Sequence, residues 1–149
     1  MGAENIGIYP VDLVISDGLI GSPTLYLNLL IDAPTGSITG SGRLTQALAP
    51  PWGDLPIASV SGQVEETGFQ SAEKLVRITG RYGIPFGPPP LIGHIEATVA
   101  MACAVNSEWS GKGSFDYGPN GENTARNCVV RNVTPKAEAM IVTPTTIAS

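Results

Sequence analysis

Hydrophobic and polar residues alternate along most of this chain with a period of two, the spacing of a β-strand with one buried face. The clearest run covers residues 95–103, where an aliphatic or sulfur-containing side chain recurs at every second position. Comparable runs predict strands near residues 11–15, 25–30, 38–45, 57–66, 75–82, 95–103, 109–117 and 128–130, with a weaker ninth at 140–142. No amphipathic helix longer than about two turns is indicated, so the fold class is all-β.

The links between the predicted strands alternate in length and composition. Long links rich in glycine and proline fall near 17–23, 47–56, 83–92 and 118–122, and shorter links fall near 33–36, 67–72, 105–106 and 134–137. Alternate links lie at the same end of an up-and-down antiparallel sheet, so the long links should share one rim. We predict an antiparallel barrel or barrel-like sandwich of eight or nine strands, mostly up-and-down, with Pro51–Gly53 beside Pro85–Gly87.

Glycines recur inside the predicted strands, at residues 39–42, 61–64, 79–82 and 110–113. A glycine in the middle of a strand indicates sharp bending or the close approach of another backbone. Repeated around a sheet, such glycines are typical of a small barrel or a strongly coiled sandwich. None of the four segments precedes a predicted helix, so phosphate-binding loops are not indicated.

Composition narrows the classes of partner. The 149 residues suit one domain spanning 1–149; 42% are apolar, only 14% are charged, and the net charge is −5. An acidic chain with few, scattered cations disfavours nucleic acid and anionic membrane surfaces. A neutral polar surface favours a protein, a glycan or self-association. No run is long enough for a membrane span, and no amino-terminal signal is visible, so we expect a cytoplasmic protein or one exported without such a signal.

Two cysteines, Cys103 and Cys128, fall on separate predicted strands. In a reducing compartment they are most simply free, buried and small apolar residues. A disulfide, or a metal-binding or catalytic role, stays open as an alternative. The sequence gives no reason to expect a cofactor or a metal ion.

Two aromatic residues in the long links, Trp52 and Phe86, each follow a proline and precede a glycine. Stiff loops lose little entropy on ordering, so exposed rings there could anchor a partner. The alternative is that both rings fold inward and close the end of the barrel. Asp54, His94 and Tyr117, which lie in or next to these links, complete the predicted binding residues.

An enzymatic alternative rests on His94, the only histidine. One histidine cannot anchor a multi-histidine metal site, but it could act as a general base at the barrel mouth beside Asp54 or Glu96. No nucleophile-elbow sequence is present, and the carboxylates are spread evenly, as on a solvated surface. The sequence therefore favours a non-enzymatic binding or assembly module over a hydrolase-like enzyme.

Three segments in the first third of the chain carry a family resemblance. They read YPVDLVI (9–15), TLYLNLLIDAP (24–34) and GSGRLTQALAPP (40–51), and together they resemble a small bacterial family of unknown function, number 1842. The resemblance implies a small bacterial all-β domain. The family has no assigned activity, so it supplies no catalytic residues.

Overall fold

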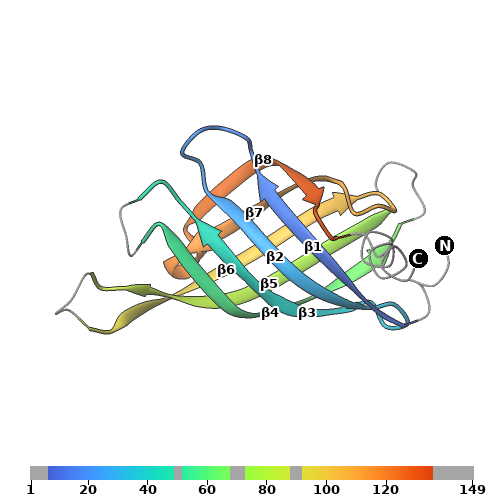
Figure 1. The fold of residues 1–149 in the computed structure, drawn as a ribbon, viewed down its shortest axis with the longest axis horizontal. Coiled ribbons are helices and arrows are strands. Elements are labelled where there is room, and N and C mark those ends of the chain that lie inside the picture. The colour runs from blue at the N-terminus through green and yellow to red at the C-terminus, as the bar shows by residue number, and fades with distance from the viewer. Residues whose placement is uncertain (1–6, 49–51, 68–72, 88–91, 136–149) are drawn as a thin grey trace, which may run out of the picture.

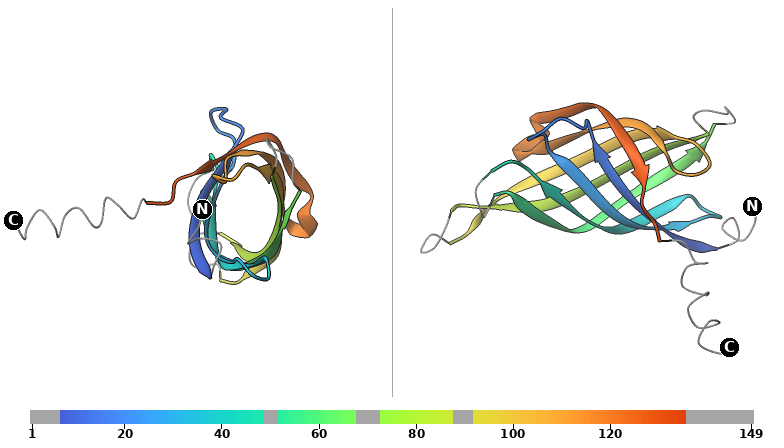
Figure 2. Two further views of the ribbon diagram at one scale, coloured as in Figure 1. Left: turned by 90° about the vertical axis from the view of Figure 1, so that its right-hand side faces the viewer. Right: turned by 45° about the horizontal axis from the view of Figure 1, so that its top comes forward.

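A computed structural model describes residues 7–48, 52–67, 73–87 and 92–135. Eight antiparallel strands pair each with the next, and the last returns to the first, which closes a barrel (Figure 1; Figure 2, left). The strands are β1 (Ile8–Ser16), β2 (Thr24–Asp32), β3 (Ser37–Thr45), β4 (Asp54–Glu66), β5 (Lys74–Pro85), β6 (His94–Val105), β7 (Gly111–Gly118) and β8 (Asn123–Asn132). The predicted all-β, up-and-down barrel is confirmed. The predicted ninth strand, 140–142, lies outside the described residues.

The barrel interior is filled by side chains from alternate positions of every strand. An eight-stranded barrel is just wide enough for its inward side chains to fill it. The largest fully buried side chains are aliphatic apart from one aromatic ring, and they are Phe115, Leu13, Ile15, Leu25, Leu27, Leu29, Ile31, Ile38, Leu44, Ile57, Ile78 and Val60. No polar or charged residue is buried in the described part of the chain. The apolar positions of the alternation therefore point into the barrel, and the polar positions point to its outer surface.

Two bulges interrupt that alternation. Gly40 pairs with Val60 while Gly42 pairs with Ile57, so two residues of β4 face one residue of β3. A bulge of this kind bends the strand and shifts the phase of its side chains by one position. Ile57 and Val60 can therefore both point inward, although three positions separate them. A second shift lies between Gly113 and Phe115, opposite β8.

Mid-strand glycines allow neighbouring strands to approach closely. A Cβ atom added at Gly62 would overlap the carbonyl oxygen of Arg77 on β5, and one at Gly111 would overlap that of Ala104 on β6. Side chains at these positions would push the strands apart. The close approach predicted from the glycine-containing segments is confirmed.

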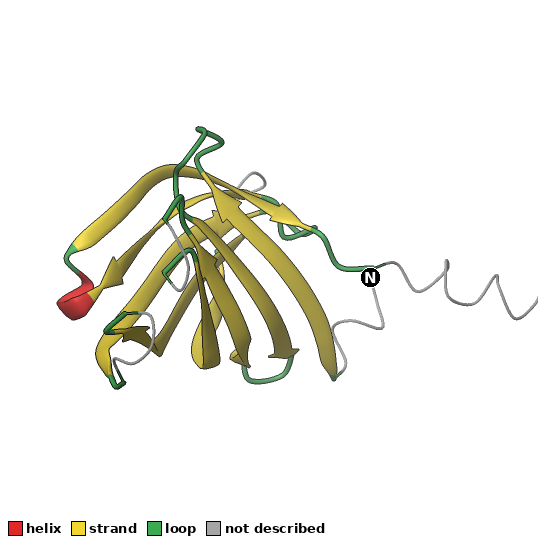
Figure 3. Cartoon of the chain, turned by 60° about the vertical axis from the view of Figure 1, so that its left-hand side comes forward, coloured by secondary structure: helices red, strands yellow, loops and turns green. Residues whose placement is uncertain are grey.

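The barrel has two different ends. The described residues of links 17–23, 46–53, 86–93 and 119–122 lie at one end, which we call the rim, and those of links 33–36, 67–73 and 106–110 lie at the opposite end. Within the rim, β5 and β6 extend furthest beyond their neighbours, at the left of Figure 1, and the short 3₁₀ helix η2 (Pro119–Gly121) is red in Figure 3. The predicted alternation in length is imperfect, because link 67–73 is as long as link 17–23.

The link 106–110 corrects one detail of the sequence analysis, which placed Trp109 on the seventh strand. That strand begins at Gly111, and Trp109 lies in the preceding turn with φ of 64°. The turn is closed by the Asn106 amide, which donates to the carbonyl oxygen of Ser110 (2.9 Å). Short hairpin loops of this type need one residue in the left-handed region, normally glycine or asparagine. The indole is nevertheless 4% exposed, so burial of the ring compensates for an unfavourable backbone conformation.

The seam between β1 and β8 is shorter than the other strand pairings. Only Leu13–Ser16 pair with Val129–Asn132. Two hydrogen bonds extend the seam: the Val133 amide donates to the Asp12 carbonyl oxygen (2.8 Å), and the Asp12 amide donates to Oγ1 of Thr134 (2.7 Å). Among the residues that the structure describes, no helix is long and apolar enough to cross a membrane.

Candidate functional site

Trp52 joins two loops of the rim. Its indole N–H donates a hydrogen bond to the carbonyl oxygen of Pro85 (2.8 Å), which links the β3–β4 connection to the end of β5. Gln46 holds the tryptophan backbone, because its side-chain amide donates to the carbonyl oxygen of Trp52 (3.1 Å). The predicted proximity of the two loops is therefore confirmed for Trp52 and Pro85, while Pro51 lies outside the described residues.

Trp52 is half-buried and its only polar group is already bonded. The sequence analysis offered two alternatives for it, a free anchor or an inward plug. Trp52 is neither a free anchor nor an inward plug, because its ring holds one loop against another through the hydrogen bond to Pro85. Trp52 is thus a positioning residue of the rim.

Phe86 stands further out. Its side chain is 53% exposed, and its amide donates to the carbonyl oxygen of Gly93 (3.2 Å). A Cβ atom added at Gly93 would lie 2.8 Å from Cε2 of the phenyl ring, and the φ of Gly93 is +103°. The ring therefore packs over a glycine that has room for it, so an exposed aromatic group is held in one place.

Other large apolar side chains are exposed around the same rim. Leu19, Ile20, Leu48, Phe86, Ile92 and Ile95 are all exposed, on links 17–23, 46–53 and 86–93 and at the start of β6. We call these six residues the apolar rim. Sequence reasoning missed every member except Phe86. The signal in the sequence was the segment Gly18–Gly21, where a leucine and an isoleucine stand between two glycines. Both glycines have positive φ in the structure.

Asp54 and His94 lie at the first positions of β4 and β6. The Asp54 carboxylate is 3.5 Å from Nε of Arg43, whose guanidinium also lies over the ring of Tyr26 (4.6 Å to the centroid). His94 is exposed, pairs with Pro85 in the β5–β6 ladder, and its ring lies against Gly83. Both residues are thus on the rim, and His94 is beside the Trp52–Pro85 contact.

Tyr117 lies one residue before the end of β7, next to the rim link 119–122. It packs against the core, with its ring 5.7 Å from that of Phe115. A second tyrosine, Tyr82, closes the rim end from inside: its hydroxyl accepts a hydrogen bond from the Gly118 amide (2.8 Å). Burial raises the pKa of the Tyr82 hydroxyl above its ordinary value of 10.0, and the Gly118 hydrogen bond opposes that shift more weakly. Sequence reasoning gave Tyr82 no role.

The groups that an enzyme would need are engaged in other contacts. Glu96 lies 3.8 Å from Arg81, and Asp54 faces Arg43, so both carboxylates considered as partners for His94 pair with arginines. Cys103 and Cys128 are free and buried, as predicted. Burial raises the pKa of the Cys103 thiol to about 12, which leaves little thiolate at neutral pH. No group of three or more metal-ligating side chains occurs in the described part of the chain.

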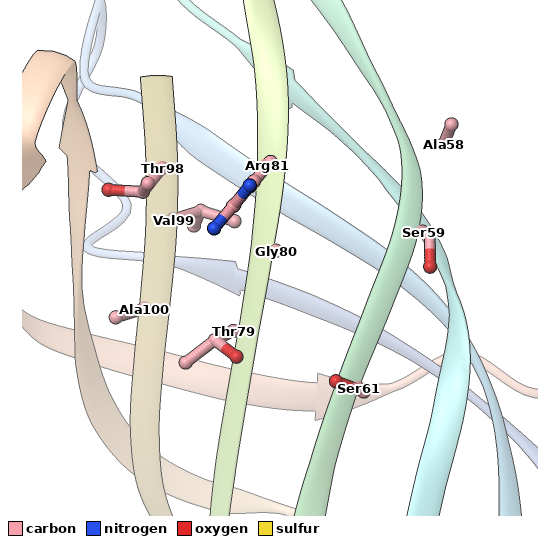
Figure 4. Close-up of a pocket in the computed structure, with 9 residues that line it drawn as sticks. All are labelled: Ala58, Ser59, Ser61, Thr79, Gly80, Arg81, Thr98, Val99 and Ala100. Atoms are coloured by element: carbon pink, nitrogen blue, oxygen red, sulfur yellow. The ribbon is translucent and has the colours of Figure 1, made fainter. Parts of the chain in front are cut away.

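The outer wall carries shallow depressions away from the rim. One, of about 620 Å³, lies over β4, β5 and β6, and Figure 4 shows hydroxyl side chains from all three strands around Arg81. Its lining residues are Ala58, Ser59, Ser61, Thr79, Gly80, Arg81, Thr98, Val99 and Ala100. None of the predicted binding residues lines it. The candidate binding surface is therefore the rim itself and not a cavity.

Comparisons with known proteins give a family and no activity. No curated protein matches the chain. The family described as "Domain of unknown function (DUF1842)" matches residues 6–123, which span β1 to β7 and reach the first residue of β8. This match covers most of the chain and includes all three segments that carried the resemblance. The chain therefore belongs to the DUF1842 family.

Proposed function

We propose that this chain is a non-enzymatic binding module that docks a protein partner through the apolar rim. The observation that carries the proposal is that six exposed, large apolar side chains lie on the links and at the start of β6 at one end of the barrel. Exposed apolar residues scattered singly are normal, but a group of them on one surface is typical of an interaction site. Phe86 is the predicted central anchor, since buried aromatic residues dominate interface energies.

The charges around the rim favour a partner with an apolar face. Arg43 is paired with Asp54 and Arg81 with Glu96, so the basic groups near the rim are balanced within the chain. Surface pairs of this kind contribute little energy. The carboxylates of Asp17 and Glu122 on the rim links have no ion pair within the described part of the chain, so the rim does not attract an anion. An apolar protein surface therefore fits better than a polyanion.

A glycan is a weaker candidate for this surface. Sugar recognition combines ring stacking with converging polar groups, and the indole N–H of Trp52 is already bonded to Pro85. The enzymatic alternative near His94 gains no support, because its candidate carboxylates face arginines. Binding is thus the function that the rim geometry supports best.

The test is site-specific photo-crosslinking followed by reconstitution. A photo-reactive amino acid is placed at Ile20 or Phe86 in cells of the source organism, and at Leu30 as a control, because Leu30 is half-exposed on the wall. We expect one shared product from the two rim positions and none of it from position 30. The partner is then identified, purified and titrated by calorimetry.

In that titration, Phe86→Ala should weaken binding at least tenfold, while Leu30→Ala and His94→Ala should leave the Kd unchanged. Phe86 is exposed, so its loss should not unfold the barrel. Equal crosslinking from the wall position, or wild-type affinity for the Phe86→Ala variant, contradicts the proposal. A loss of binding on His94→Ala alone would instead favour the site near the histidine.

A further inference from the structure

The β5–β6 hairpin extends beyond the rest of the barrel as a pair of strands. β4 pairs with β5 only as far as Arg81, and β7 pairs with β6 only as far as Thr98. Beyond these points, Tyr82–Pro85 and His94–Ala97 pair with each other, and we call these two segments the hairpin tip. The tip projects at the left of Figure 1. It has two strand edges that no other strand of the described chain covers.

The β5 edge of the tip is protected against further pairing. Pro85 has no N–H, and its carbonyl oxygen already accepts the hydrogen bond from the indole of Trp52 (2.8 Å). Proline on an edge strand blocks the addition of another strand, because it cannot donate to the ladder. A further strand is therefore not expected on this side of the hairpin.

The β6 edge of the tip has no such protection. Alternate residues of an antiparallel strand turn their main-chain groups to opposite neighbours. The Phe86 amide donates to the Gly93 carbonyl oxygen (3.2 Å), so odd-numbered residues face β5 and even-numbered residues face the free edge. His94 and Glu96 therefore direct their N–H and C=O groups to that edge. In the described part of the chain, no hydrogen bond joins these groups to β7 or to link 119–122.

The inner face of the tip is apolar. Ala97 is fully buried in the barrel, and Ile95, two positions earlier, continues its face beyond the barrel mouth. Ile95 is 47% exposed, and beyond it the ring of Phe86 lies over Gly93. The free edge of β6 thus borders an exposed apolar face.

One register makes this edge complementary to itself. An antiparallel pair centred on Ile95 places His94 of each molecule opposite Glu96 of the other. The main-chain groups that face the edge then meet, which gives up to about four hydrogen bonds. A register centred on Glu96 would instead set two carboxylates opposite each other, which is unfavourable. The paired residues end before Thr98, where link 119–122 lies beside the strand.

We propose that two copies of this chain pair through the free edges of β6, as an antiparallel two-fold dimer centred on Ile95. An unpaired strand edge is a template for another chain, and a second copy supplies the main-chain pattern that this register requires, with no proline to interrupt it. The contact is isologous and therefore closed, so it gives a dimer and no longer assembly. Because the strands are antiparallel, the two barrels extend in opposite directions from the contact.

The dimer joins the inner faces of two hairpin tips. Its two-fold axis is perpendicular to the shared sheet, so Phe86 and Ile95 of both copies lie on the same side. The joined face is a larger apolar surface than one rim presents alone. The inference goes beyond the proposed function, because the dimer forms without any other protein and is tested without one.

Disulfide formation tests the register. Opposite residues of a non-hydrogen-bonded pair have Cα atoms about 4.5 Å apart, which a disulfide can bridge. Under mild oxidation, Ile95→Cys should give a disulfide-linked dimer at least about tenfold faster than Thr98→Cys, which is exposed on the same strand but lies away from the centre. The native Cys103 and Cys128 are buried and should not react. Non-reducing electrophoresis measures both rates.

Sedimentation velocity over a concentration series tests the main-chain contact. The wild type should reach twice the mass of one 15.4 kDa chain. Glu96→Pro removes the N–H at the edge but no hydrogen bond to β5, so it should keep the fold and weaken dimerisation at least about tenfold. Glu96→Gln keeps that N–H and should weaken it less. Leu30→Ala, on the wall, should dimerise like the wild type.

Three results would overturn the inference. A wild-type chain that stays monomeric up to about 1 mM excludes the contact. Equal disulfide rates for Ile95→Cys and Thr98→Cys exclude the register. A Glu96→Pro variant with wild-type thermal unfolding and wild-type dimerisation shows that another surface is used. If that variant does not fold, the two disulfide rates alone decide. None of these results bears on the proposed function, which depends on photo-crosslinking to a partner.

Discussion

The two ends of this barrel come from the same up-and-down topology and differ in the side chains that their links expose. The rim exposes Leu19, Ile20 and Phe86 on links rich in glycine and proline, whereas the opposite end exposes carboxylates such as Glu65 and Glu108. The strands between them are a shared scaffold with an apolar interior. The difference therefore lies in the links and in the strand ends beside them, and links are where binding residues on rigid scaffolds are usually found.

Each end is also closed by a different aromatic residue. Trp109 closes the opposite end from a turn and accepts a left-handed backbone conformation to do so. Tyr82 closes the rim end from the middle of β5 and spans β6 to reach Gly118. The first closure depends on apolar burial and the second on a hydrogen bond. Substitution of the two residues should therefore lower the free energy of unfolding by different amounts.

The largest effect is expected for Trp109→Ala. Removing a buried tryptophan side chain costs about 3–5 kcal/mol, and the variant should show that loss of unfolding free energy in urea titration. Trp109→Gly is the matched control, because glycine adopts a positive φ without strain. It should recover at most about 1 kcal/mol relative to alanine. A glycine variant as stable as the wild type would show that the indole does not stabilise this end.

The second largest loss of unfolding free energy is expected for Tyr82→Phe. The ring stays, but the Gly118 amide loses its acceptor inside the barrel. An unsatisfied buried donor costs about 1–3 kcal/mol. Urea unfolding at pH 8 measures the difference, and Tyr26→Phe is the control, since Tyr26 lies on the outer wall under Arg43. Equal stability of the two variants would contradict the role given to Tyr82.

The stability difference between the wild type and Tyr82→Phe should also depend on pH in the alkaline range. The folded-state pKa of Tyr82 is raised above its ordinary 10.0, so both states hold the proton below about pH 10 and the contribution of the tyrosine is complete there. As the pH rises further, the unfolded state loses its proton first, and the folded state loses stability until its own pKa is reached. The stability advantage of the wild type over Tyr82→Phe should therefore shrink above pH 10. A constant difference would contradict the raised pKa.

Much of the fold followed from the sequence, because period-two patterns and turn residues report directly on burial. Residues 95–103 predicted β6, and the mid-strand glycines predicted the close strand approach seen at Gly62. The position of Trp109 did not follow, because a tryptophan in a left-handed turn contradicts the local preference and is explained only by what the ring contacts. Bulges such as the one after Ile57 also could not be predicted, because they break the period of two on which the strand predictions rest.

The candidate site was less predictable for a different reason. The sequence placed Trp52 and Phe86 at one rim because alternate links lie at the same end of the barrel, and the hydrogen bond from the indole of Trp52 to Pro85 joins the two links. It could not show that Tyr117 faces the core or that Asp54 pairs with Arg43. Both depend on the register between strands, which single-strand patterns do not contain.

A smaller loss of stability is expected for Trp52→Phe, which keeps an aromatic ring and removes the indole N–H that donates to Pro85. One partly exposed hydrogen bond contributes about 0.5–1.5 kcal/mol. The loss should be local, so amide hydrogen exchange should speed up in β5 and β6 near Pro85 and His94 while β2 stays protected. His94→Gln is the control for local disturbance. Uniform exchange changes across the barrel would contradict a local brace.

The smallest effect on stability is expected at the tip of the rim. Ile20 is 104% exposed, so Ile20→Ser removes no buried surface and should change the free energy of unfolding by less than about 0.5 kcal/mol. Leu27→Ser, at a fully buried position of the next strand, is the contrasting variant and should lose several kcal/mol, because a polar group enters the core as well. Thermal unfolding of both variants measures the contrast. A large isoleucine that adds nothing to stability supports a role in binding, whereas a loss above about 1 kcal/mol for Ile20→Ser would make the rim part of the folded core.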